Sequence, residues 1–165
     1  MLGRLLHRLA RAFAIAGAAV ALTVALMVVA SVAGRAVWRT PVPGDVELTQ
    51  FGIALAISLG LSWCQWRRAN IVVDFFTARL APRAQARLDA AGALLVAAMC
   101  ALLAWRSAAG ALAVRAAGET TMIVALPMWW TYALLAPGLA LAALVALWQA
   151  AGHWRGDLPA AEAAA

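Results

Sequence analysis

The feature that most constrains this chain is a series of apolar runs, separated by clusters of arginine, that are each long enough to cross a lipid bilayer. A helix of about 20 mostly apolar residues spans the hydrocarbon core. Such runs cover about residues 12–34, 48–66, 88–114 and 127–150. Since backbone polar groups in lipid must bond within their own segment, the runs predict an all-α fold with four transmembrane helices. We expect residues 1–152 to form a single four-span membrane domain and residues 153–165 a disordered cytoplasmic tail.

The composition supports a membrane protein. Hydrophobic residues make up 66% of the chain and charged residues 12%, about half the share that is usual in soluble proteins. All thirteen basic residues are arginine, which together with the abundant alanine indicates a GC-rich coding genome and a bacterial source. The net charge of +6 favours arginines that flank the spans over nucleic-acid binding, because there is no soluble domain to present a binding face.

The distribution of arginine predicts the topology. If the N-terminus is cytoplasmic, nine arginines fall on the cytoplasmic side: Arg4, Arg8, Arg11, Arg67, Arg68, Arg79, Arg83, Arg87 and Arg155. Four fall on the outer side: Arg35, Arg39, Arg106 and Arg115. This excess predicts a multi-pass protein of the bacterial inner membrane with both termini in the cytoplasm.

Two further segments have the pattern of amphipathic helices at a membrane surface. Residues 1–11 alternate arginine and leucine at helical spacing. Residues 70–81 mix apolar residues with polar ones, Asp74 among them, and are too few to span a bilayer. We therefore expect a short interfacial amphipathic helix between the second and third spans.

The outer connection between the first two spans ends one helix and begins another. Two prolines and Gly44 interrupt the first helix. Asp45 and Glu47 follow where a new helix would begin, and negative charge is favoured there. Arg106, in the third run, has two interpretations: its side chain reaches the lipid head groups, or it forms an ion pair with an acidic residue of the outer loops, such as Asp45, Glu47 or Glu119.

The second span carries its polar side chains on one face. The residues Gln50, Ala54, Ser58, Ser62 and Gln65 recur at helical spacing. An amide exposed to lipid is costly, so this face is expected to be buried against protein. The surface that covers this face could belong to this subunit or to a partner.

The sequence lacks the residues that common membrane chemistries need. His7 and His153 lie near the two ends of the chain, so no span supplies haem ligands. Cys64 and Cys100 have no partner for a metal site. No acidic residue is buried within a span, and no nucleophile triad or phosphate loop is present. We therefore predict no catalytic, cofactor-binding or metal site. A self-contained oligomeric transporter or channel, lined by the polar face of the second span, remains an alternative.

Several motifs, in order, resemble those of one family. They are Pro41–Leu48 before the second span, Ile71–Asp74 after it, Gly118–Thr121 before the fourth span, and the turn Leu126–Trp129. Over about residues 10–152 the chain resembles the small membrane subunit of tripartite ATP-independent periplasmic (TRAP) transporters, the DctQ-like family. One position departs from the pattern: members often have a histidine where this chain has Asn70.

The resemblance implies a role and partners. The small subunit is expected to be a scaffold that braces the large membrane subunit and helps the periplasmic substrate-binding protein dock. The complex would take up organic acids or similar anions, driven by an ion gradient. The implied partners are these two proteins and membrane lipids, with no cofactor. The candidate partner-interface residues are Pro43, Gly44, Asp45, Glu47, Gln50, Ser58, Ser62, Asp74, Arg115, Gly118, Glu119, Thr120 and Thr121.

Overall fold

The computed structural model of the chain describes residues 1–68 and 81–155. The predicted interfacial helix at 70–81 falls, apart from its last residue, outside the described residues, and Asp74 and Asn70 lie outside them too. The same holds for residues 156–165 of the predicted tail. Residues 153–155 form the last turn of the fourth helix.

The fold contains four long helices, as the apolar runs predict. They are α1 (Leu2–Trp38), α2 (Asp45–Trp66), α3 (Pro82–Ala117) and α4 (Trp129–Arg155). All four are long and apolar enough to cross a membrane. Within the described ranges the β structure amounts to one isolated bridge, between Thr120 and Pro127. The all-α prediction is confirmed, and the described residues hold four helices of the expected kind.

The helices are longer than the apolar runs from which they were predicted. Helix α1 has 37 residues and α3 has 36, each about 55 Å long, whereas the hydrocarbon core is about 30 Å thick. The ends of these helices that carry arginine remain helical. Hydrophobicity indicates which residues lie in lipid and does not indicate where a helix ends. Local geometry sets the actual ends: α3 begins at Pro82 and closes at Gly118, whose φ is +67°.

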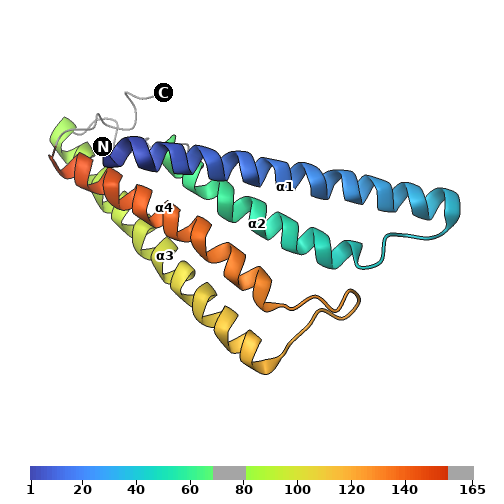
Figure 1. Cartoon of the computed structure of the whole chain (residues 1–165). Helices are drawn as coiled ribbons and strands as arrows, with labels where there is room; N and C mark the ends of the chain where they lie inside the picture. Colours follow the sequence, from blue (N-terminus) through green and yellow to red (C-terminus); the bar gives the residue numbers. More distant parts are fainter. Residues whose placement is uncertain (69–80, 156–165) are drawn as a thin grey trace.

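The helices lie side by side in the order α1, α2, α4, α3. Helix α1 packs on α2, α2 packs on α4, and α4 packs on α3, with a smaller contact between α1 and α4. Figure 1 shows the four helices close together at the end that holds the N-terminus, which we call the N-terminal end, and spread apart toward the opposite end. We call that opposite end the hairpin end, because it carries the connection 118–128.

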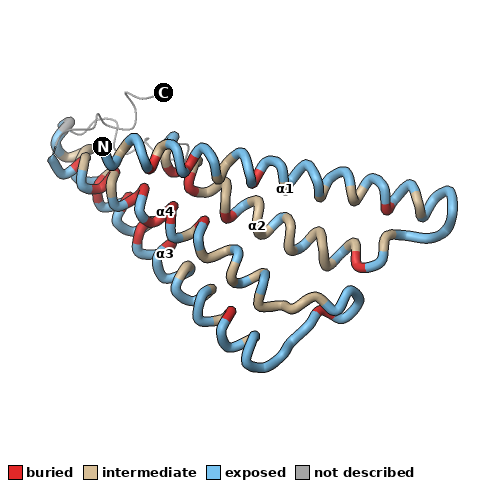
Figure 2. Tube along the Cα trace, viewed as in Figure 1, coloured by how far each residue is buried: buried red, intermediate tan, exposed pale blue. Residues whose placement is uncertain are grey.

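The buried residues gather at the N-terminal end (Figure 2). One cluster joins Leu6 of α1 to Leu141 and Val145 of α4, with the indole rings of Trp66 and Trp148 packed on it. These two rings are stacked, with 5.1 Å between their centroids. The amphipathic pattern of residues 1–11 had suggested a separate element at the membrane surface, but these residues do not form one. They continue α1 and pack onto α4.

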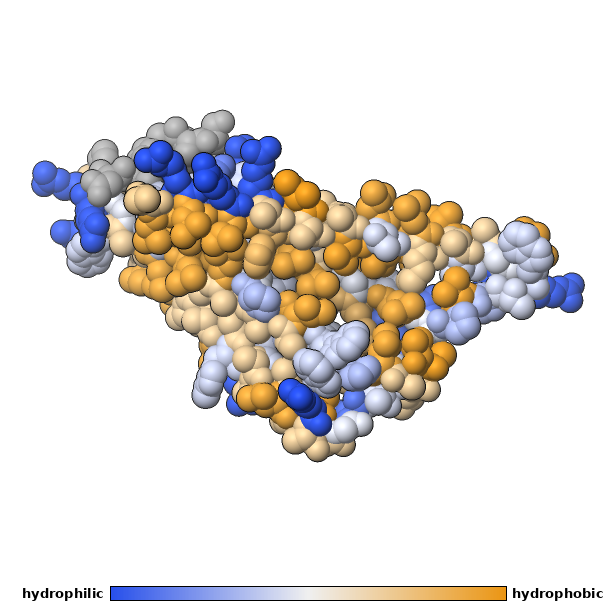
Figure 3. Space-filling model, in the orientation of Figure 1, coloured by the Kyte–Doolittle hydropathy of each residue, from blue (hydrophilic) through white to orange (hydrophobic). Residues whose placement is uncertain are grey.

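The outer surface is apolar across the middle of the molecule. Figure 3 shows hydrophobic residues over most of the central part of this face, and hydrophilic residues at the N-terminal end, at the far end of α1 and along the lower edge. Since lipid replaces water around such a surface, its exposed leucines and valines are in a favourable environment.

Polar side chains between α2 and α4 bond to groups of the chain itself. The Ser58 hydroxyl donates to the Leu135 carbonyl oxygen at 2.7 Å. Nearer the N-terminal end, the amide nitrogen of Gln65 donates to the Gln149 side-chain oxygen at 2.7 Å. The Gln149 amide nitrogen in turn donates to the Gln65 carbonyl oxygen, also at 2.7 Å. The sequence left open whether the polar face of α2 packs within this subunit or against a partner. The hydrogen bonds described above all lie within the subunit.

The close crossing of α2 and α4 depends on Gly138. A Cβ atom at this position would lie 2.5 Å from the carbonyl oxygen of Ser58. The absence of a side chain therefore allows the two backbones to approach, as small residues do in other membrane helix pairs.

We expect Gly138→Ala to destabilise the protein by about 1–3 kcal/mol, because the added methyl group overpacks the crossing. Gly92→Ala is the matched control, since a Cβ there meets nothing within 4 Å. Unfolding of the purified protein in detergent, followed by tryptophan fluorescence, measures both. Equal stability of the two variants would contradict the role given to Gly138.

Candidate functional site

A cluster of hydrogen-bonded carboxylates lies where α2 begins. Asp45 and Glu47 both stand in its first turn, after Gly44, which has a φ of +71°. The partial positive charge of a helix N-terminus favours both carboxylates. We call these two carboxylates, together with the groups that bond to them, the acidic corner.

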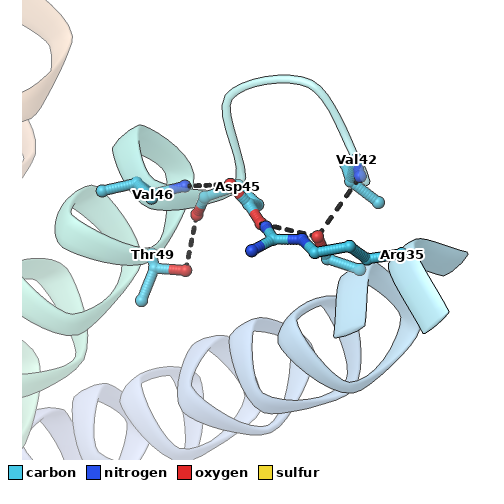
Figure 4. Close-up of polar contacts among 6 residues, drawn as sticks. Arg35, Val42, Asp45, Val46 and Thr49 are labelled. Carbon is cyan, nitrogen blue, oxygen red and sulfur yellow. Dashed lines mark hydrogen bonds and ion pairs between the residues drawn. The ribbon is translucent and has the colours of Figure 1, made fainter. Parts of the chain in front are cut away.

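Asp45 joins the end of α1 to the start of α2 (Figure 4). Its Oδ2 accepts hydrogen bonds from the Ser31 hydroxyl at 2.5 Å and from Arg35 Nη2 at 3.2 Å. Its Oδ1 accepts from the backbone N–H of Val46 at 2.8 Å. The Ser31 oxygen also accepts from the Val42 N–H at 3.2 Å, so the connection between the helices is held as well.

The hydrogen bonds to Asp45 contribute differently to stability. The Arg35–Asp45 ion pair is open to solvent, with 62% of the arginine side chain exposed, so it contributes at most about 1 kcal/mol. Ser31 is 1% exposed, and without Asp45 its buried hydroxyl would lose an acceptor. The Ser31–Asp45 bond is therefore the stronger constraint on this corner.

Glu47 joins α2 to the connection between α3 and α4. Its Oε1 accepts a hydrogen bond from the backbone N–H of Ile123 at 3.0 Å, and its Oε2 accepts from that of Val124 at 3.3 Å. A carboxylate that accepts from two backbone amides fixes both the position and the orientation of the chain that carries them.

The connection held by Glu47 is itself ordered as a hairpin. The N–H of Thr121 donates to the Leu126 carbonyl oxygen at 2.9 Å, and the N–H of Met128 donates to that of Glu119 at 3.0 Å. The N–H of Leu126 also donates to the Thr121 hydroxyl at 3.2 Å. The hairpin therefore leaves α3 at Gly118 and returns to α4 with its two arms bonded to each other.

Together the two carboxylates tie the spread ends of the helices to one another. Asp45 holds α1 to α2, and Glu47 holds α2 to the hairpin that joins α3 and α4. The helices themselves are apart at this end (Figure 1), so these polar contacts replace the apolar packing found at the N-terminal end.

The outer arginines take different positions. The Arg115 guanidinium lies over the ring of Trp129, 5.2 Å from its centroid. Arg106 is exposed, and the described residues offer it no ion pair. Asp45 pairs with Arg35, and Glu47 is bonded to backbone amides. The interpretation in which Arg106 reaches the lipid head groups fits this exposure better.

The predicted interface residues divide by exposure. Ser58, Ser62, Thr121 and Gly44 are buried. Asp45 and Glu47 are half-buried, while Asp74 lies outside the described residues. The exposed ones are Pro43, Gln50, Arg115, Gly118, Glu119 and Thr120.

Sequence reasoning missed Ser31 and Arg35, which complete the acidic corner. A signal was present, since Ser31 is polar within an apolar run and lies one helical turn before Arg35. The backbone amides of Ile123 and Val124 carried no signal of their own, because any residue type supplies an N–H.

No arrangement for metal or solute chemistry is seen in the described residues. They contain no group of three or more His, Cys, Asp or Glu side chains that could hold a metal ion. A hollow of about 220 Å³ between α2, α4 and the end of the hairpin has a mostly apolar lining with one hydroxyl, that of Thr131: Phe51, Gly52, Leu55, Leu126, Pro127, Trp130, Thr131 and Leu134. Such a lining offers a charged solute almost no hydrogen bonds.

The chain was compared with known protein families. The family described as the DctQ component of tripartite ATP-independent periplasmic transporters matches residues 24–156. No curated protein and no solved structure matches the chain. The matched residues include the acidic corner and the hairpin.

We expect Glu47→Gln to loosen the hairpin, because the neutral amide offers one oxygen in place of two charged ones. Hydrogen exchange at the Ile123 and Val124 amides should become roughly tenfold to a hundredfold faster, the range for loss of bonds to a charged group. Hydrogen-exchange mass spectrometry of residues 118–128 measures this. Glu119→Gln is the control, since that exposed side chain makes no bond within the described residues. Unchanged exchange in the Glu47 variant would show that the carboxylate does not hold the hairpin.

Proposed function

The chain belongs to the DctQ component family of tripartite ATP-independent periplasmic transporters, and from this premise we propose that it is a scaffold that braces the large membrane subunit and helps the periplasmic binding protein to dock. In this proposal the large subunit moves the solute, and the soluble protein captures it. The transported solutes are organic acids or similar anions, and an ion gradient drives their uptake.

The observation that carries this proposal is how the polar groups within the spans are used. Ser58, Gln65 and Gln149 bond to one another or to backbone carbonyls, and so hold α2 against α4. A carrier needs polar groups left free to receive a solute at mid-membrane. Side chains committed to holding helices together suit a rigid support.

The hairpin end supplies the proposed docking surface. The tip of the hairpin presents Met122, 99% exposed, and Ile123, 64% exposed. The bonds from Glu47 hold this tip in one conformation, so a partner would not have to order it on binding. With both termini in the cytoplasm, as the arginine distribution predicts, the tip faces the periplasm.

The alternative of a self-contained oligomeric channel has less support. It requires the polar face of α2 to line a pore. Ser58, Ser62 and Gln65 of that face are buried within the subunit, which leaves Gln50 exposed. A pore built from several copies would have to break the α2–α4 contact first.

Deleting this subunit should abolish uptake by cells that keep the large subunit and the binding protein. A tagged copy, solubilised in a mild detergent, should bring down the large subunit. The control is a tagged membrane protein of similar size from outside the transporter. If no large multi-span subunit co-purifies, the scaffold proposal fails.

The proposed orientation has its own test. Alkaline phosphatase, which is active only in the periplasm, should be active when inserted at Gly118 and inactive when fused after Arg155. Green fluorescent protein, which folds in the cytoplasm, should fluoresce at the second position. The reverse pattern would place the hairpin in the cytoplasm and exclude its contact with a periplasmic protein.

A further inference from the structure

Three arginines lie on one exposed face of α1 at the N-terminal end. Arg4, Arg8 and Arg11 follow one another at steps of four and three positions, so their side chains share one face of the helix. All three residues are exposed, and together they rise about 10 Å along the helix axis. We call these three residues the arginine stripe.

The charge of the arginine stripe is not compensated by the described part of the chain. None of the three guanidinium groups forms an ion pair within residues 1–68 and 81–155. Helix α1 itself contains no acidic residue that would offset them. Like charges one turn apart on a helix repel one another, so an anion beside the stripe would stabilise the start of α1.

The same face of α1 is apolar beyond the arginine stripe. Ile15, Leu22 and Leu26 continue this face at helical spacing, and each of them is 62% exposed. Figure 3 shows hydrophilic residues at the N-terminal end directly beside hydrophobic ones. Where lipid acyl chains cover the apolar part of the face, the head groups of the same lipids lie next to the arginine stripe.

Aromatic rings place the arginine stripe at the edge of the membrane. The ring of His7, which lies between Arg4 and Arg8 in the sequence, is 5.4 Å from that of Trp63 and 5.3 Å from that of Trp66. Indole rings gather at the level of the lipid head groups. The head-group layer is about 5–8 Å thick on each side of the bilayer, and long arginine side chains reach it from a neighbouring turn.

The arginine stripe is presented on a fixed backbone. On the other side of the same turns, Leu6 is 5% exposed and packs on Leu141 and Val145 of α4. Ala10, one turn further, is fully buried. A ligand that binds the stripe therefore does not have to order the helix first.

Exposed leucines beside the arginine stripe favour a lipid over a soluble anion. Leu5 and Leu9 are 55% and 40% exposed and lie on the adjoining side of α1. A soluble anion would leave these side chains in water. A phospholipid covers them with its acyl chains while its phosphate oxygens accept hydrogen bonds from the guanidinium groups.

We propose that the arginine stripe binds the head groups of anionic phospholipids. The net negative charge of these lipids offsets the three arginines, whereas a neutral phospholipid carries a cation of its own beside the phosphate. With the N-terminus in the cytoplasm, as the arginine distribution predicts, the lipids belong to the cytoplasmic leaflet. The inference is independent of the scaffold role, because it requires only that the chain spans a membrane.

Lipid binding by the purified full chain tests the proposal. Native mass spectrometry compares phosphatidylglycerol with phosphatidylcholine that has the same acyl chains. We expect the wild-type chain to bind phosphatidylglycerol more tightly. The double variant Arg8→Gln with Arg11→Gln should lose roughly tenfold to thirtyfold of this preference, about fivefold for each arginine near an anionic surface.

The matched control is the double variant Arg83→Gln with Arg87→Gln. It removes the same charge from two exposed arginines of α3 at the same end of the molecule and should leave the preference unchanged. Equal losses in the two double variants would assign the preference to the overall charge of this end and overturn the proposal. Equal binding of the two lipids by the wild-type chain, or no loss in the α1 variant, would overturn it as well.

Photo-crosslinking in the native membrane gives a second measurement that leaves the arginines in place. The full chain carries p-benzoylphenylalanine at Leu9, beside the arginine stripe, or at Val32, which is 60% exposed toward the opposite end of α1. Anionic phospholipids, identified by mass spectrometry, should form a larger share of the lipid adducts at Leu9 than at Val32. Equal shares at the two positions, or adducts mainly with protein at Leu9, would contradict a lipid-binding surface.

Discussion

The rest of the structure depends on how two carboxylates at the start of α2 are held. Asp45 receives the Ser31 hydroxyl from α1, and Glu47 receives two backbone amides of the hairpin. Apolar packing and the hydrogen bonds between Gln65 and Gln149 join the helices toward the N-terminal end. Lipid competes with side chains for apolar contacts and cannot compete for hydrogen bonds. The spread hairpin end is therefore held by polar contacts, and these fix the position of the hairpin.

The same competition explains how α2 is divided. Its serines and Gln65 lie inward, where Leu135 and Gln149 complete their hydrogen bonds. The exposed residues of α2, among them Gln50, lie away from these hydrogen bonds. Helix α2 is thus packed against α1 and α4 and exposed on its remaining side.

The sequence predicted some parts of the site and missed others for physical reasons. It identified Asp45 and Glu47 because acidic residues after Gly44 mark a helix start. It also grouped Gln50 with Ser58 and Ser62, since all three fall on one side of a helical wheel. The structure separates them: Ser58 and Ser62 are buried, whereas Gln50 lies at the edge and is exposed. A helical wheel gives the direction of each side chain around one helix. The neighbouring helices determine which of those side chains are buried.

The sequence by itself determined the four spans, their helical form and the excess of arginine at one end, because the bilayer imposes a length and a polarity on each segment alone. Only the tertiary structure decided that the helices lie in the order α1, α2, α4, α3, that residues 1–11 continue α1, and that Glu47 reaches the hairpin. Those features depend on contacts between residues far apart in the chain. The amides that Glu47 binds belong to the backbone, which has the same donor at almost every position and leaves no trace in the sequence.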